Sequence, residues 1–194
     1  MTNPTTSTAR VRREKILKTF NALPKEIQDY FEDMNLLLLN KEIPASVLLA
    51  YVFFMIEQGQ TELIYFGARK IHRTAKDLSR KIIFKQHMTR EAFLRFFKTI
   101  YAKEIPEKIV KTLESAEAIR DKVMHGKDKG MRESERNRAI LSVFSYAQEM
   151  NKFFAQENFG IIPYGSNKGR MGRAKPCDAS TTRWILIGMG FSVS

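Results

Sequence analysis

The sequence predicts an all-α protein: a helical bundle with a long antiparallel helix pair and shorter helices, plus a C-terminal extension rich in glycine and basic residues. Apolar residues recur every three or four positions over most of the chain up to residue 158, the period of a helix that buries one face. Up to that point no useful length of sequence alternates apolar and polar residues as a half-buried strand does. The bundle is expected to occupy residues 9–160.

The first half of the bundle follows a polar N-terminal segment, residues 1–8, which is predicted to be a disordered tail. A basic amphipathic helix comes next, and a proline in a tolerated first-turn position opens the following one. The third helix is apolar on nearly all sides, as a central core helix is, and is expected to stop or kink at Gly59. The expected helices cover residues 9–20, 24–40, 44–59 and 61–82.

The second half contains three more helices with recognisable ends. Thr89 is suited to cap the first, Pro106 to open the second, and Gly126 to end the second. A short charged loop, residues 127–132, then leads to a long amphipathic helix. These three helices are expected over residues 91–102, 106–125 and 134–158.

The C-terminal extension, residues 161–194, has a different composition. Residues 163–175 combine glycines and basic residues without periodicity, which predicts a flexible basic loop. A last short element contains Trp184, and its sequence leaves helix and strand equally open. Tyr164 and Trp184 are candidate stacking platforms for bases.

Charge and cysteine content limit the class of protein. Thirty-three Lys and Arg residues against 21 Asp and Glu give a formal charge of +12. A field of that sign attracts nucleic acid, although a generically basic surface has the same charge. Cys177 is the only cysteine, which excludes an internal disulfide and a thiolate zinc cluster and favours a reducing, cytoplasmic compartment.

No membrane segment is expected. The polar N-terminus lacks the apolar stretch of a signal peptide. The longest apolar run, residues 45–56, is interrupted by Ser46 and is too short to span a bilayer. This run is interpreted as part of a buried core helix. The aromatic residues at helical spacing are interpreted in the same way: Phe53, Phe54, Phe96, Phe97, Phe144, Phe153 and Phe154.

One histidine lies at a predicted helix end among ionisable residues. Arg120-Asp121-Lys122-Val123-Met124-His125 closes a charged helix, and a glycine, a loop and a long amphipathic helix follow. The bare spacing is a weak signal, since about one such match is expected by chance. Arg80 and His87 form a decoy that lacks this context. His72 and His87 are expected on polar helix faces or in loops.

This segment resembles the signature of the HEPN family of helical-bundle proteins, in which a histidine follows an arginine by four to six residues. The resemblance covers approximately residues 30–158. It implies a metal-independent endoribonuclease with Arg120 and His125 as catalytic residues and with a composite site in the cleft of a homodimer. It further implies toxin-like or antiviral RNA cleavage, with a cognate inhibitor or antitoxin as a possible partner.

The chemistry also follows from the residues themselves. Cleavage of RNA by its own 2′-hydroxyl needs a proton acceptor, stabilisation of charge at phosphorus and a proton donor for the leaving oxygen. The imidazole of His125 exchanges protons near neutral pH, and the Arg120 guanidinium matches phosphate oxygens. Asp121, four residues before His125, lies on the same helix face, where it is suited to orient the imidazole or raise its pKa.

Helix geometry separates the two catalytic candidates. Five residues at about 100° each place Arg120 and His125 roughly 140° apart around a regular helix. Either the helix frays at Gly126 so that His125 swings round, or two motifs face each other across a two-fold axis. The HEPN resemblance implies the second arrangement.

RNA is the expected ligand. The basic residues nearest the motif and in the C-terminal loop are the candidate RNA-binding residues: Lys122, Lys127, Lys168, Arg170 and Arg173. No cofactor and no metal site is expected, because the chain lacks paired His and Cys ligands, a phosphate-binding glycine loop and a serine-nucleophile elbow.

Three other interpretations compete with catalysis. In the first, the motif residues are ordinary surface charges near a helix C-terminus, where cations are mildly favoured. In the second, the chain is a catalytically inactive RNA-binding or partner-binding protein of the same fold. A DNA-binding regulator is the third, and the lack of an evident helix-turn-helix counts against it.

Overall fold

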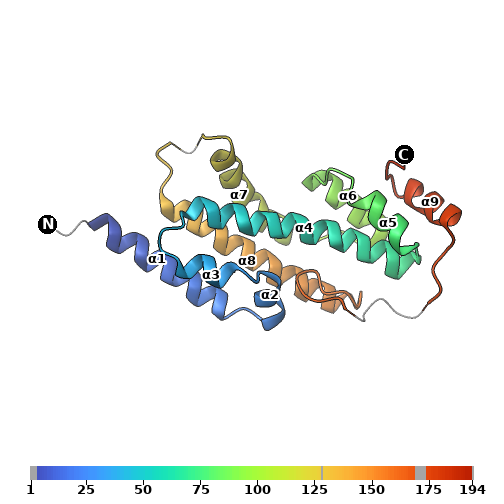
Figure 1. The fold of residues 1–194 in the computed structure, drawn as a ribbon, viewed down its shortest axis with the longest axis horizontal. Coiled ribbons are helices and arrows are strands. Elements are labelled where there is room, and N and C mark those ends of the chain that lie inside the picture. Colours follow the sequence, from blue (N-terminus) through green and yellow to red (C-terminus); the bar gives the residue numbers. More distant parts are fainter. Residues whose placement is uncertain (1–3, 128, 169–173, 194) are drawn as a thin grey trace. The chain divides into compact units, whose positions relative to one another are not determined.

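The computed structural model describes residues 4–127, 129–168 and 174–193 (Figure 1). All regular secondary structure within these residues is helical, which confirms the all-α prediction. The helices are α1 (Pro4–Asn21), α2 (Lys25–Tyr30), α3 (Met34–Leu39), α4 (Ala45–His72), α5 (Lys76–Ile83), α6 (Arg90–Tyr101), α7 (Glu107–Met124), α8 (Glu133–Gln156) and α9 (Ala179–Gly188).

The chain divides into two compact units. Unit 1 consists of residues 1–56 and 107–153, and unit 2 of residues 57–106 and 154–194. The long helices α4 and α8 contribute residues to both units. The Arg120–His125 motif therefore belongs to unit 1, and the C-terminal segment 161–194 to unit 2.

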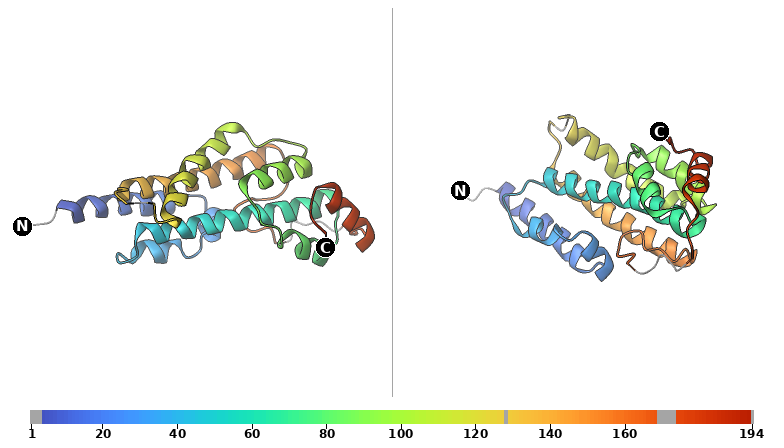
Figure 2. Two further views of the ribbon diagram at one scale, coloured as in Figure 1. Left: turned by 90° about the horizontal axis from the view of Figure 1, so that it is seen from above. Right: turned by 45° about the vertical axis from the view of Figure 1, so that its right-hand side comes forward.

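Unit 1 is built around aromatic side chains from distant parts of the sequence. The fully buried ring of Phe144 on α8 lies 5.5 Å from the ring of Phe20 on α1 and 5.7 Å from the ring of Phe31 after α2. The chain reverses between α7 and α8, so that these two helices run in opposite directions (Figures 1 and 2). They form the expected long antiparallel pair, with the motif at the end of the first helix.

Unit 2 has close contact between α4 and α6. A Cβ atom added at Gly67 on α4 would lie 2.7 Å from side-chain atoms of both Ile100 and Tyr101 on α6. The Tyr101 hydroxyl donates a hydrogen bond of 2.7 Å to the carbonyl of Leu63, and its ring packs against Phe97 at 4.6 Å between centroids. Glycine is thus required at position 67 for the close approach of α6.

The C-terminal segment is an integral part of unit 2. The Thr182 hydroxyl on α9 accepts a hydrogen bond of 2.9 Å from the backbone N–H of Ala75, at the start of α5. Phe191 stacks on Phe96 of α6, with 4.1 Å between the ring centroids. The element around Trp184, left open by the sequence, is helix α9, and Asp178 caps it by accepting from the backbone N–H of Thr181.

The helix ends expected at Thr89 and Gly126 are confirmed. Thr89 is the N-cap of α6, and its hydroxyl accepts a hydrogen bond of 3.2 Å from the backbone N–H of Ala92. Gly126 has a positive φ of 64° directly after α7. Both residues satisfy or redirect backbone groups that a helix end leaves without partners.

The expected break at Gly59 is wrong, because α4 continues through this residue to His72. Glycine in a helix interior costs about 1 kcal/mol relative to alanine, and burial of the apolar residues on either side, such as Ile56 and Leu63, outweighs that cost. The helix ends instead at Arg73, which has a φ of 55°. Residues 76–83 then form the separate helix α5.

Two further boundaries differ from the expectation. The helix expected over residues 24–40 is divided into α2 and α3, because Phe31 leaves the helical conformation with φ −92° and ψ 53°. Phe31 is fully buried, so its packing in the core accounts for the turn. Helix α1 begins at Pro4 rather than Ala9, and residues 4–8 are helical rather than a tail.

Helix α4 is partly exposed. Phe54 is 62% exposed, so its assignment to the core is wrong, while the other six aromatic residues expected in the core are buried. With 28 residues, α4 is longer than the apolar run seen in the sequence and would be long and apolar enough to cross a membrane. Half of its apolar window is buried inside the structure.

Candidate active site

The C-terminal end of α7 remains a regular helix up to the motif histidine. The backbone N–H of His125 donates to the carbonyl of Asp121 at 3.0 Å, and that of Lys127 donates to the carbonyl of Lys122 at 2.8 Å. The second bond spans five residues around the left-handed Gly126, which is the Schellman pattern of helix ends. Fraying before His125 therefore does not occur.

Arg120 is held against the core of unit 1. Its guanidinium carbon lies 5.0 Å from the centre of the Phe53 ring on α4, within the range of a cation–π contact. Phe53 is buried, whereas the Arg120 side chain retains 27% of its surface exposed. The guanidinium is thus positioned by an aromatic face while part of it stays accessible.

Asp121 pairs with the arginine. Its Oδ1 lies 2.9 Å from the Nε of Arg120, and its side chain is 58% exposed. The sequence placed Asp121 on the same helix face as His125, as a residue to orient the imidazole. In the structure its carboxylate contacts the guanidinium instead.

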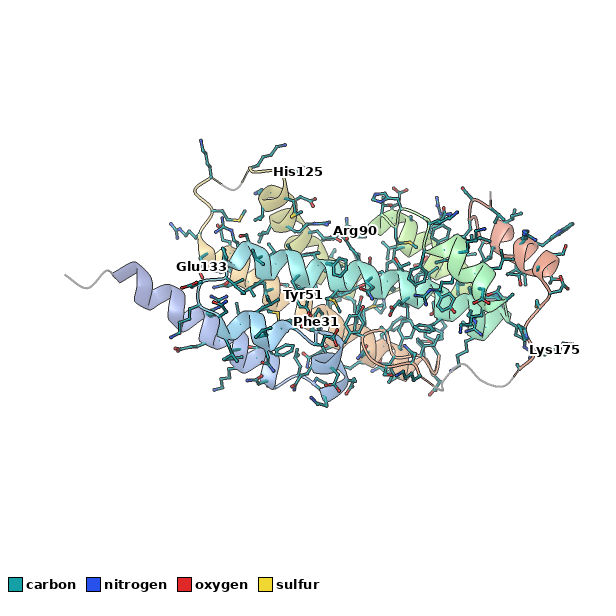
Figure 3. All side chains as sticks on the ribbon, in the orientation of Figure 1. Phe31, Tyr51, Arg90, His125, Glu133 and Lys175 are labelled. Atoms are coloured by element: carbon teal, nitrogen blue, oxygen red, sulfur yellow. The ribbon has the colours of Figure 1, made fainter. Side chains whose placement is uncertain are left out.

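His125 lies at the tip of α7, where the chain enters the loop to α8 (Figure 3). Its side chain is exposed. Because α7 is regular from Arg120 to His125, the two side chains leave the helix roughly 140° apart. The chain therefore presents the Arg120 guanidinium and the exposed His125 imidazole in different directions.

The surroundings of His125 are basic. Lys122 and Lys127 are both exposed, as the RNA-binding prediction requires, and Lys129 is exposed in the following loop. The loop ends at Arg132, whose backbone N–H donates a hydrogen bond of 2.9 Å to the Glu135 carboxylate. This contact caps the start of α8 and fixes one end of the loop.

The remaining RNA-binding candidates belong to unit 2. Lys168 is exposed, and Arg170 and Arg173 lie outside the described residues. Tyr164 is fully buried and is not available to stack on a base, whereas Trp184 is 77% exposed. At the start of this segment, the Asn167 side chain bonds both the N–H and the carbonyl of Ile162.

The other two histidines have different environments. The Nε2 of His72 lies 3.0 Å from the carbonyl of Ile100 and is half-buried. His87 is exposed in the connection between α5 and α6, as expected for the decoy. His87 is therefore a suitable control for His125.

Among the described residues, no cluster of three or more His, Cys, Asp or Glu side chains is arranged to hold a metal ion. Comparisons with protein-family models, with curated proteins and with solved structures found no match to this chain.

Phe53 is the site residue that the sequence did not identify. It was interpreted only as a core residue, and its contact with Arg120 depends on how α4 and α7 pack. An aromatic residue in an apolar helix carries no signal of which distant arginine covers it.

Proposed function

We propose that this chain is a metal-independent endoribonuclease of the HEPN type. One observation carries the proposal: a regular helix ends in an exposed histidine, and five residues earlier it holds a partly exposed arginine on an aromatic face. Lys122 and Lys127 add exposed positive charge at the same helix end, which favours an approaching phosphate backbone.

Each group has a role in cleavage by the neighbouring 2′-hydroxyl. The imidazole of His125 takes the proton of this hydroxyl, the 2′-oxygen attacks phosphorus, and the bond from phosphorus to the 5′-oxygen breaks. Arg120 stabilises the negative charge that develops on the phosphate oxygens. The departing 5′-oxygen receives a proton from a second imidazole or from water, which leaves a 2′,3′-cyclic phosphate and a 5′-hydroxyl.

The active species is proposed to be a homodimer. A single regular α7 directs Arg120 and His125 about 140° apart, so one copy does not place both groups on one phosphate. Two copies related by a two-fold axis bring the arginine of one subunit to the histidine of the other. Two-fold symmetry is the commonest arrangement of homo-oligomers.

A catalytically inactive RNA-binding or partner-binding protein is the second candidate. It is favoured by the contacts of Arg120, since packing on Phe53 and pairing with Asp121 give this arginine a structural role without catalysis. RNA binding without cleavage by the wild-type protein distinguishes this candidate.

The biological setting is part of the proposal. A toxin-like or antiviral ribonuclease acts on cytoplasmic RNA, and a cognate inhibitor or antitoxin restrains it. The single cysteine and the positive charge of the chain are compatible with that location and substrate.

Product analysis tests the proposed chemistry. Purified protein is incubated with end-labelled single-stranded RNA and with the same sequence as DNA, each with and without chelator. The proposal predicts RNA products with 2′,3′-cyclic phosphate and 5′-hydroxyl ends, no change with chelator, and intact DNA. Cleavage of the DNA, or complete inhibition by chelator, assigns the activity to a different site.

A further inference from the structure

Most of the net positive charge lies outside the unit that carries the motif. Unit 2 contains sixteen Lys and Arg residues against seven Asp and Glu, so it holds nine of the twelve net positive charges. Unit 1 is close to balanced. A polyanionic ligand is therefore attracted mainly by unit 2.

Within unit 2, a pocket of about 390 Å³ lies between α5, α9 and the C-terminal segment. Among the described residues, its charged lining residues are all cations: Lys81 on α5, Lys85 in the turn after α5 and Arg183 on α9. Gln86 and Ser192 add polar groups, and the remaining lining is apolar: Leu78, Ile82 and Val193.

A pocket in unit 1, in contrast, has a lining in which positive and negative charges are balanced. It is lined by three cations and three carboxylates: Arg13, Lys41, Arg136, Glu14, Glu42 and Glu133. The guanidinium of Arg13 there donates to backbone carbonyls, including that of Ile43 at 2.8 Å. Charges in that pocket are compensated within the protein, whereas the described residues that line the α5–α9 pocket include no carboxylate.

The backbone segments that carry the cations of the α5–α9 pocket are held together by hydrogen bonds. Lys81 lies in the last turn of α5, and Lys85 follows in the turn directly after the helix ends at Ile83. Arg183 follows Thr182, whose fully buried hydroxyl bonds the N–H of Ala75 at the start of α5. At the other end of α5, Gln86 donates a hydrogen bond of 3.2 Å to the carbonyl of Ser192.

Figures 1 and 2 show α9 beside α5 in every view. The positive groups are thus brought together by packing rather than by a chance meeting of long side chains. Like charges that line one pocket repel each other. An anion that neutralises them removes this repulsion, which favours binding.

We propose that the α5–α9 pocket is an RNA-binding site in which Lys81, Lys85 and Arg183 bind phosphates of the backbone. RNA is named as the ligand because the inference rests on the proposed function. The three cations are exposed, which suits an extended backbone that remains in contact with solvent rather than an enclosed small ligand.

Substitution of the three cations tests the site. The variant Lys81→Gln, Lys85→Gln, Arg183→Gln is compared with a control, Lys76→Gln, Lys98→Gln, Lys103→Gln. The control removes the same charge from exposed residues of the same unit that do not line the pocket. Both sets carry His125→Ala so that RNA remains intact, and binding of labelled single-stranded RNA is measured by fluorescence anisotropy over a range of salt concentrations.

Loss of three phosphate contacts reduces the magnitude of the slope of log affinity against log salt concentration by about 2. It also lowers the RNA affinity on the order of 100-fold at about 0.1 M salt. The RNA affinity of the control variant falls less than about 3-fold, and its salt dependence stays that of the parent protein. A charge-preserving variant, Lys81→Arg, Lys85→Arg, Arg183→Lys, retains binding, and circular dichroism shows that the pocket variant itself is folded. Equal losses in pocket and control variants, or no loss in either, overturn the proposal.

Two outcomes separate this proposal from the proposed catalysis. Wild-type protein that binds RNA through the pocket but cleaves none contradicts the ribonuclease and leaves the pocket proposal standing. Wild-type protein that cleaves RNA, with a pocket variant that binds like the control, overturns only the pocket proposal. Tight binding of a mononucleotide that the pocket variant loses, without any loss of RNA affinity, also overturns it.

Discussion

The guanidinium of Arg120 lies 5.0 Å from the centre of the Phe53 ring, so α4 fixes the position of the motif arginine on α7. The contact joins a buried aromatic residue to a cation that is still partly exposed. A cation–π contact of this kind contributes about 0.5 to 2 kcal/mol. The position of Arg120, and with it the proposed activity, therefore depends on Phe53.

Replacement of this ring tests the dependence. Phe53→Leu is expected to lower the specific activity of the folded protein about 10-fold, because an error of about 1 Å in the position of a catalytic group is costly. The matched control is Phe31→Leu, which also removes a buried ring of unit 1. Activity is measured at a temperature where circular dichroism shows both variants folded. Equal activity of the two variants contradicts a positioning role for Phe53.

The close approach of α6 to α4 at Gly67 gives a prediction about stability. Gly67→Ala places a methyl group 2.7 Å from Ile100 and Tyr101 and is expected to cost about 1 to 3 kcal/mol in the free energy of unfolding. Gly188→Ala is the control, since an added Cβ there meets no atom within 4 Å among the described residues. Urea unfolding of both variants measures the difference. A Gly67→Ala protein as stable as the wild type shows that the helices are not in close contact.

Tyr101 gives a prediction about alkaline pH. Burial raises the pKa of Tyr101 well above its usual value. Because the folded pKa is the higher one, the contribution to stability is fully present below the unfolded pKa of about 10 and is lost as pH rises further.

Tyr101→Phe is expected to cost about 1 kcal/mol at pH near 8, because the hydrogen bond to Leu63 is lost. From pH near 8 to pH near 11, the wild type is expected to lose more stability than the variant, so that the gap between their free energies of unfolding narrows. Deprotonation of lysines affects both proteins alike. A gap that stays constant over this pH range shows that the phenol is not protected by burial.

The proposed homodimer makes a prediction about mixed subunits. If the second imidazole protonates the departing 5′-oxygen, an excess of folded His125→Ala protein is expected to inhibit the wild type after subunit exchange, because mixed dimers lack that imidazole. The same protein added immediately before the assay, without time for exchange, controls for competition for RNA. If sedimentation shows a monomer at concentrations where cleavage per molecule remains full, the composite site is refuted.

Local signals in the sequence predicted the parts of the fold that local chemistry decides. Thr89 marks a helix start because its own hydroxyl accepts a hydrogen bond from a backbone N–H of the first turn. Gly126 marks a helix end because glycine readily adopts the positive φ found there. Gly59 and Phe31 were mispredicted because burial by distant residues outweighs local preference at both positions. Phe54 has the apolar spacing of a core residue, and only the packing of α4 reveals that it faces solvent.

The candidate site shows the same division. The order Arg120, Asp121 and His125 at a helix end, with glycine and a loop after it, is visible in the sequence. Contacts between distant elements are not visible in the sequence. They include the packing of Arg120 on Phe53 and the shared pocket of Lys81, Lys85 and Arg183. The basic character of residues 61–82 is apparent from the sequence, but the pocket requires α9, which lies a hundred residues further along the chain.

Cleavage of labelled single-stranded RNA by the wild type, Arg120→Ala, His125→Ala and His87→Ala is the most direct test of the central claim. Removal of a catalytic acid–base or charge-stabilising group costs about 100-fold or more. The account predicts active wild type, a loss of that size in Arg120→Ala and His125→Ala with the helical content retained, and an unchanged His87→Ala. A wild type that leaves the RNA intact, or Arg120→Ala and His125→Ala proteins that cleave as fast as the wild type, would contradict it.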